Sequence, residues 1–196
     1  MRCGIDVGGT KIETAILSDS GEFLFRERIN TPDSYKAMIH SIEECVKTAA
    51  EDTGYDGPVG ICMPGSVSKK TGLIQGANTI YLNGQNFQKD LRATLNVEVR
   101  LANDANCFAL SEAIEGAGAE ANVVFGVIIG TGCGGGIVVN GHLVTGTNGI
   151  TGEWGHNPLP WPVSNEFDNH DCWCGKTGCL ETYISGTAFE KDYQRV

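Results

Sequence analysis

Hydrophobic and polar residues alternate along the first part of the chain, as they do in β-strands with one buried face. Residues 3–5 and 12–17 form two short apolar runs, and residues 22–29 follow after the turn-forming sequence 18–21. Short apolar segments separated by turn residues predict an antiparallel β-meander.

A helical periodicity replaces this alternation after Ser34. Apolar residues recur at three- and four-residue intervals up to Thr53, and Gly54 follows, which predicts a helix between a serine cap and a glycine stop. Further along we expect a buried strand at 58–63, a short amphipathic helix at 87–95, a strand at 97–101 and a helix at 105–115, with 73–80 irregular. Strands that alternate with helices indicate an α/β fold.

The second half of the chain repeats the opening pattern. An apolar strand at 123–129 leads into a glycine-rich segment at 130–136 and a further strand at 137–140. Two strand–glycine turn–strand units in one chain suggest an internal duplication. We expect a hinge at 115–119 between two domains, residues 1–118 and 119–196, and a helix from residue 187 onward.

Composition and charge restrict the class of partner. The chain has 196 residues, of which 41% are hydrophobic, as in ordinary globular proteins. A net charge of −10 argues against nucleic acid or an anionic membrane as the main partner and favours a small-molecule ligand. Because the N-terminus lacks an apolar stretch of signal-peptide length, and 18 apolar residues never run together, we expect a cytoplasmic protein.

Two glycine clusters that follow strands are candidates for binding phosphate. The first lies between Asp6 and Lys11, and the second is the segment 130–136. Without a Cβ atom, glycine lets backbone N–H groups approach an anion closely. Gly130, Gly132 and Gly135 also fit the dinucleotide fingerprint, but that motif must open a helix, and β-branched residues follow here. Turns that bind no ligand are the alternative.

Three cysteines and a histidine have the spacing of a metal site. Cys172, Cys174 and Cys179 are separated by two and five residues on a glycine-containing turn, and His156 precedes them. Three thiolates and one imidazole complete a tetrahedral zinc site, and four protein ligands leave no open position, so we expect structural zinc. His170 is a rival fourth ligand, and free thiols or a disulfide are the alternative to a metal.

Asp104 lies where a strand is expected to end and a helix to begin. Open α/β sheets bind ligands at this edge, although a carboxylate here could also cap the helix. Glu153, His156 and Glu181 flank the expected metal loop. Such polar residues in a chain with phosphate-binding turns favour a polyhydroxylated substrate beside a nucleotide.

Five motifs, in order, resemble those of the ROK family of sugar kinases. They lie at residues 6–11, 103–106, 130–135, 152–156 and 172–181. The resemblance implies an actin-like, ribonuclease-H-like fold of two domains with the sugar in a cleft between them. Because chains of the family are longer, it also implies that the second domain is truncated.

The resemblance implies a role for individual residues. Asp104 would be the catalytic base, and His156 would both bind zinc and hydrogen-bond the sugar. The residues implied to bind ATP, with Mg²⁺ near Asp6, are Asp6, Gly8, Gly9, Thr10, Lys11, Gly130, Thr131, Gly132, Gly134 and Gly135. Those implied to bind the sugar are Gly65, Asn78, Asn103, Asp104, Glu153, His156 and Glu181.

The branch of the family decides the expected sugar. Residues 76–85 and 156–161 resemble the bacterial fructokinase branch, which implies transfer to the 6-hydroxyl of fructose. Residues 103–112 also suit the N-acetylglucosamine kinase branch, which is the alternative. Repressors of the family need a helix-turn-helix ahead of Asp6, where only five residues stand, and Asp104 argues against a silent sugar sensor. A homodimer is left open.

Overall fold

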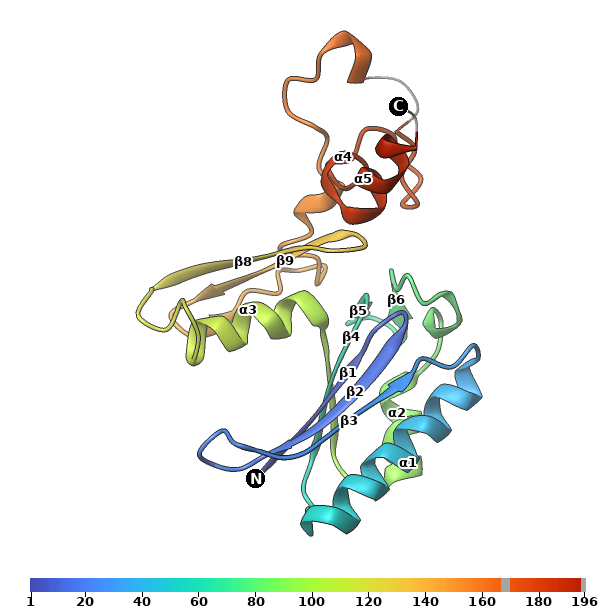
Figure 1. Ribbon diagram of the computed structural model, residues 1–196, viewed down its shortest axis with the longest axis vertical. Helices are drawn as coiled ribbons and strands as arrows, with labels where there is room; N and C mark the ends of the chain where they lie inside the picture. The colour runs from blue at the N-terminus through green and yellow to red at the C-terminus, as the bar shows by residue number, and fades with distance from the viewer. Residues whose placement is uncertain (167–169, 195–196) are drawn as a thin grey trace. The chain divides into compact units, whose positions relative to one another are not determined.

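The computed structural model describes residues 1–166 and 170–194 (Figure 1). The chain forms two compact units, Met1–Asp104 (unit 1) and Ala105–Val196 (unit 2), and each is described by itself. Among the described residues, no helix combines the length and apolarity needed to cross a membrane.

Unit 1 is built on a five-stranded mixed sheet with the order β3-β2-β1-β4-β7. Strands β1 and β2 and strands β2 and β3 pair antiparallel, which confirms the predicted meander, whereas β4 and β7 continue the sheet in parallel. The strands are β1 (Arg2–Val7), β2 (Lys11–Leu17), β3 (Phe23–Asn30), β4 (Val59–Met63) and β7 (Val99–Asn103).

Two helices cover one face of this sheet. Alternate residues of β1, Cys3, Ile5 and Val7, are buried, as a strand with one covered face requires. They belong to the same apolar cluster as residues of α1 (Tyr35–Thr53) and α2 (Phe87–Leu95). The core of unit 1 is therefore one continuous apolar cluster between the sheet and its two helices.

The ends of the first helix confirm the sequence prediction. Ser34 occupies the N-cap position of α1, although its side chain makes no capping hydrogen bond, and Gly54 ends the helix in the left-handed region at a φ of 71°. Helix α2 has the predicted bounds, and the Asn86 side chain accepts a hydrogen bond from the N–H of Lys89. Strand β7 begins later than the predicted strand at 97–101 and runs to Asn103.

Short elements fill the segment that was predicted to be irregular. Strands β5 (Ser66–Val67) and β6 (Ile74–Gln75) pair antiparallel, and a single 3-10 turn, η1 (Ile80–Leu82), follows. These elements bring the loop around residue 77 beside the end of β4.

Unit 2 begins with helix α3, which continues from Asp104 to Ile114. Its residues pack on a three-stranded antiparallel sheet of order β10-β9-β8, and Ala109 and Val138 lie in one apolar cluster. The strands are β8 (Val123–Ile129), β9 (Cys133–Val139) and β10 (His142–Leu143). Both units thus contain a three-stranded meander with its second strand in the middle, which agrees with an internal duplication.

Strand β9 begins earlier than the predicted strand at 137–140. Gly134, Gly135 and Gly136 lie inside the strand and not in the turn. The reason is tertiary packing, because a Cβ on Gly136 would lie 2.7 Å from the Cβ of Ala109 on α3. Glycine here allows the helix to approach the sheet closely.

The rest of unit 2 consists of short elements. They are the 3-10 turns η2 (Trp154–His156) and η3 (Ser164–Glu166) and the helices α4 (Glu181–Ile184) and α5 (Gly186–Tyr193). Helix α5 begins one residue before the helix predicted from residue 187 onward, whose last two residues, 195–196, lie outside the described part. The compact units divide between Asp104 and Ala105, after the first residue of α3 and earlier in the chain than the predicted domain boundary at 118/119.

Candidate functional site

Asp104 is the first residue of α3 and directly follows the last residue of β7. It is exposed. The side-chain amide of Asn103 donates one hydrogen bond to Asp104 Oδ1 at 3.0 Å and another to the backbone carbonyl of Gly65 at 3.1 Å. The strand end therefore orients the carboxylate through its neighbour. The structure brings together three of the predicted site residues in unit 1.

Gly65 occupies a position that only glycine fits. Its φ of 78° is in the left-handed region, and a Cβ would lie 2.6 Å from both Ala77 N and Gln75 O. The loop that follows β6 therefore lies directly against Gly65. Asn78, a predicted sugar ligand, is exposed on that loop.

The first glycine turn connects β1 to β2. The N–H of Gly8 donates to the carbonyl of Lys11 at 2.9 Å, and the hydroxyl of Thr31 donates to the carbonyl of Gly8 at 2.7 Å. Gly9 and Thr10 are exposed at its tip. The turn is therefore fixed at its base and open at the end that was predicted to meet phosphate.

Asp6 is exposed on β1, next to this turn. Cys62 is its partner in the parallel register of β1 and β4, and the Cys62 thiol donates to Asp6 Oδ1 at 3.2 Å. The sequence did not indicate this contact, because 56 positions separate the two residues.

The second glycine turn is shorter than predicted. The N–H of Gly130 donates to the carbonyl of Gly132 at 2.9 Å, and the N–H of Gly186, at the start of α5, donates to the carbonyl of Gly130 at 2.7 Å. Thr131 is exposed at the tip. Gly134 and Gly135, also predicted to bind phosphate, lie in β9, where a Cβ on Gly135 would lie 2.9 Å from the carbonyl oxygen of Gly126.

Residues 152–156 lie flush on strand β9. A Cβ on Gly152 would collide with the carbonyl of Gly135, and a Cβ on Gly155 would collide with the carbonyl of Cys133. Two glycines thus let one backbone approach another.

This contact places two predicted site residues. The indole N–H of Trp154 donates to the carbonyl of Gly134 at 2.6 Å and fixes the 3-10 turn η2 to the sheet. Glu153 precedes that turn, His156 ends it, and both are partly buried. The backbone that carries the Glu153 and His156 side chains is therefore held firmly against the sheet.

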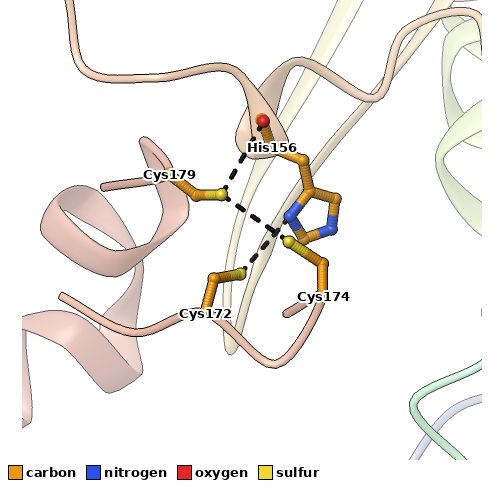
Figure 2. Close-up of side chains that lie close together, drawn as sticks. All are labelled: His156, Cys172, Cys174 and Cys179. Atoms are coloured by element: carbon orange, nitrogen blue, oxygen red, sulfur yellow. Dashed lines mark hydrogen bonds between the residues drawn. The ribbon is translucent and has the colours of Figure 1, made fainter. Parts of the chain in front are cut away.

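The four predicted metal ligands come together in unit 2 (Figure 2). One donor atom from each of His156, Cys172, Cys174 and Cys179 lies within 4.8 Å of all the others. The two sulfurs of Cys174 and Cys179 are 3.7 Å apart, and Cys172 Sγ is 3.5 Å from His156 Nδ1. Zinc–sulfur bonds of about 2.3 Å at tetrahedral angles separate two sulfurs by roughly 3.8 Å. The donors therefore fit a tetrahedral zinc ion.

A tight turn presents the sulfurs. Asp171 and Thr177 form a bridge across it, and the N–H of Cys172 donates to the carbonyl of Lys176 at 2.8 Å. Gly175 and Gly178 have φ values of 85° and 76°, which other residues rarely adopt. Part of the polar loop 165–171 that precedes this turn, residues 167–169, lies outside the described residues.

The three thiols have different acidities. Burial raises the pKa of the Cys172 and Cys179 thiols, that of Cys179 to about 12 with a contribution from the neighbouring thiols. Burial also acts to raise the pKa of Cys174, but hydrogen bonds from the N–H of Lys176 and from the other two thiols outweigh it and lower that pKa. Crowded thiols resist losing all their protons unless a cation is present.

The alternatives to this set of ligands do not match the geometry. The ring of His170 stacks on Tyr183 with centroids 4.0 Å apart, outside the cluster. All eight cysteines fall within the described residues and are free, and the 3.7 Å between Cys174 and Cys179 exceeds an S–S bond of about 2.05 Å.

Glu181 is held at both of its carboxylate oxygens. Oε2 accepts from the N–H of Cys133 at 2.7 Å, and Oε1 accepts from the indole N–H of Trp173 at 2.7 Å. The sequence indicated Glu181 but missed Trp173. The signal that could have revealed it is an aromatic residue between two metal-ligating cysteines.

Comparison with known proteins decides the family. Residues 2–196 match the ROK family. The chain belongs to the ROK family. An N-acetyl-D-glucosamine kinase of Escherichia coli is 41% identical over 199 residues, which cover 99% of this chain and 66% of that protein. The chain thus spans slightly less than two thirds of the length of this relative.

Solved structures of ROK proteins share the fold. A glucokinase of Streptomyces griseus in complex with glucose and AMPPNP superposes with a TM-score of 0.83 at 31% identity, covering 99% of this chain and 60% of that one. A ROK hexokinase of Thermus thermophilus gives a TM-score of 0.81 at 29% identity, covering 99% and 63%. These matches confirm the predicted α/β fold of the actin-like, ribonuclease-H-like class.

Proposed function

We propose that the protein is an ATP-dependent sugar kinase that phosphorylates the 6-hydroxyl of N-acetyl-D-glucosamine. The observation that best supports this substrate is the 41% identity, over 99% of this chain, to a protein named N-acetyl-D-glucosamine kinase. The relatives do not support our sequence-based preference for fructose. The alternative sugar therefore becomes the main proposal, and fructose the second candidate.

Unit 1 supplies the base in this proposal. Asp104 takes the proton of the 6-hydroxyl as the sugar oxygen bonds to the γ-phosphorus of ATP, and the bond to the bridging oxygen breaks to release ADP. The hydrogen bond from Asn103, at 3.0 Å, sets the direction of the Asp104 carboxylate. Positioning and charge neutralisation supply most of the catalysis in phosphoryl transfer.

Unit 2 supplies further sugar ligands in this proposal. Because His156 Nδ1 faces the sulfurs at 3.5 Å from Cys172, its other ring nitrogen is directed away from them and would hydrogen-bond a sugar hydroxyl (Figure 2). Glu153 and Glu181 would accept hydrogen bonds from other hydroxyls. Asn78 and Gly65, in unit 1, are the other residues that the family resemblance implies for sugar binding.

The metal in this proposal is zinc with a structural role. His156, Cys172, Cys174 and Cys179 would hold it, since their donor set and spacing fit a closed tetrahedral site. Such an ion supplies rigidity and fixes the His156 ring, because a ligating nitrogen determines the tautomer and leaves the other nitrogen for hydrogen bonding.

The nucleotide in this proposal binds through the two glycine turns. The tips at Gly9 and Thr10 and at Thr131 are exposed, and their backbone N–H groups would meet the phosphates. Mg²⁺ would be held near Asp6.

An assay of the complete protein tests this function. Purified, zinc-loaded protein is given ATP and Mg²⁺ with N-acetylglucosamine, fructose, glucose or mannose, and ADP release is measured. We expect kcat/KM for N-acetylglucosamine to exceed that for fructose at least about tenfold, because a site that pairs the acetamido group loses those contacts with another sugar. A higher value for fructose would reverse the choice of sugar. No transfer to any hexose by folded protein would contradict the kinase function.

A further inference from the structure

Trp173 contacts two residues that are proposed to bind sugar. Its indole N–H donates to Glu181 Oε1 at 2.7 Å. Its ring meets that of His156 edge to face, with centroids 5.1 Å apart and planes at 79°. Because Cys172 and Cys174 flank it, the backbone of Trp173 is positioned by the metal-binding turn.

The two hydrogen bonds to Glu181 come from structures of different rigidity. The donor to Oε2 is the backbone N–H of Cys133 in strand β9, which the sheet holds in place. A Cβ on Gly132 would lie 2.6 Å from the same oxygen, so the carboxylate has little room on that side. The donor to Oε1 belongs to the turn, whose order depends on its ligands.

Burial does not explain a tryptophan at this position. Trp173 is 61% exposed, so much of its apolar surface remains in water and contributes little to stability. A tryptophan that faces solvent with its N–H directed at a carboxylate makes a polar contact that other large apolar residues cannot make.

We propose that Trp173 is a positioning residue that orders Glu181, and with it the sugar site, according to the state of the metal-binding turn. This rests on the proposed function, because Glu181 and His156 matter for catalysis only if they bind sugar. The indole N–H fixes the plane of the Glu181 carboxylate, and the ring edge limits rotation of the His156 imidazole. When the turn loosens, Glu181 keeps the Cys133 contact but loses its orientation.

The first test observes the hydrogen bond itself and needs no activity. The indole ¹⁵N–¹H signals of the three tryptophans in the complete, zinc-loaded protein are assigned with single Trp→Phe variants. In Glu181→Gln we expect the Trp173 signal to move, because a neutral amide replaces a charged acceptor. Trp161, which is 92% exposed, is the internal control whose signal stays in place. Removing zinc with a chelator should move the Trp173 signal as well. If the Trp173 signal moves neither in Glu181→Gln nor on removal of zinc, the proposal is wrong.

The second test separates positioning from stability. Trp173→Phe keeps an aromatic ring beside His156 and removes the N–H, and Trp161→Phe is the matched control at another exposed position. We expect Trp173→Phe to raise the KM for sugar about tenfold, the usual scale for a hydrogen bond to a charged group, with unchanged KM for ATP and unchanged zinc content. An unchanged KM for sugar, or loss of zinc from this variant, would overturn the positioning role. If the unsubstituted protein phosphorylates no hexose, the proposed function fails, and the spectroscopic test still decides the link between Trp173 and Glu181.

Discussion

The side chain of Asn83 forms two hydrogen bonds with the backbone of a single residue, Ala77. Asn83 Oδ1 accepts from the N–H of Ala77 at 2.9 Å, and Asn83 Nδ2 donates to its carbonyl at 2.8 Å. The Asn83 amide therefore pairs with both backbone groups of Ala77, as the backbone of a neighbouring strand would. Since Ala77 precedes Asn78 and lies against Gly65, the pair of bonds holds the loop beside the Asn103–Asp104 corner.

Asn83→Ala should loosen this loop. We expect a loss of about 1 to 2 kcal/mol in the free energy of unfolding, because two hydrogen bonds of roughly 1 kcal/mol each disappear. The KM for sugar should rise several-fold if Asn78 binds the substrate. Denaturant unfolding and steady-state kinetics measure both effects.

Asn83→Asp is a second variant for that change. It keeps the acceptor for the N–H of Ala77 but turns a carboxylate oxygen toward the carbonyl that Asn83 Nδ2 contacts at 2.8 Å, so it should also be less stable than the unchanged protein. Equal stability and equal KM in all three proteins would show that the two bonds do not hold the loop.

Gly65→Ala should be more damaging than the same change at another left-handed glycine. A residue other than glycine in this region costs roughly 1 to 2 kcal/mol. Gly72 has a φ of 72° and nothing within 4 Å of its Cβ position, whereas a Cβ on Gly65 would lie 2.6 Å from Ala77 N. We therefore expect Gly72→Ala to show the backbone cost alone and Gly65→Ala to add a clash, for a total of about 3 kcal/mol or more.

The kinetic effect of Gly65→Ala follows from the carbonyl of Gly65. That carbonyl accepts from Asn103, so a shift of the backbone should disturb the Asn103–Asp104 pair and lower kcat. Thermal unfolding and kcat of the two glycine variants are compared side by side. If both variants lose the same stability and keep the same kcat, the close contact with Ala77 has no consequence.

Much of the fold could be predicted because its signals are local. Ser34 and Gly54 mark the ends of α1 through backbone chemistry that the sequence displays directly. The spacing of Cys172, Cys174 and Cys179 likewise restricts three sulfurs to one turn.

What the sequence could not provide depends on contacts between distant segments. Gly134–Gly136 looked like a turn, but they lie in β9, and the small size of Gly135 and Gly136 serves the packing of residues 152–156 and of α3 against that strand. The contacts of Asn83 with Ala77 and of Trp173 with Glu181 exist only after loops have folded against each other. The periodicities and motifs of the sequence do not predict such pairs of contacting residues.

Cys174→Ser should remove the metal and weaken the sugar site. A hydroxyl replaces one of three thiolates, so we expect zinc affinity to fall at least about tenfold and the KM for sugar to rise because the turn that bears Trp173 loosens. Zinc content by elemental analysis and a competing chelator measure the affinity. Cys107→Ser, a partly buried cysteine outside the cluster, is the control and should keep its zinc. Full zinc content in Cys174→Ser would remove Cys174 from the site.

Asp104→Asn distinguishes a catalytic base from a helix cap. Asparagine keeps the size of the side chain and can still accept the hydrogen bond from Asn103, but it cannot take a proton at neutral pH. We expect sugar to bind with similar affinity while phosphoryl transfer slows by about 10² to 10⁴, the usual contribution of a positioned general base.

If Asp104 were only a cap of α3, asparagine would replace it with little loss, because the two residues cap helices about equally well. Turnover, sugar affinity by calorimetric titration and the melting temperature are therefore measured together on the complete protein. Near-normal turnover would assign Asp104 to the helix end alone. Slow turnover with normal sugar affinity and an unchanged melting temperature would place the lost energy in the transition state, because neither the folded protein nor its sugar complex would have changed.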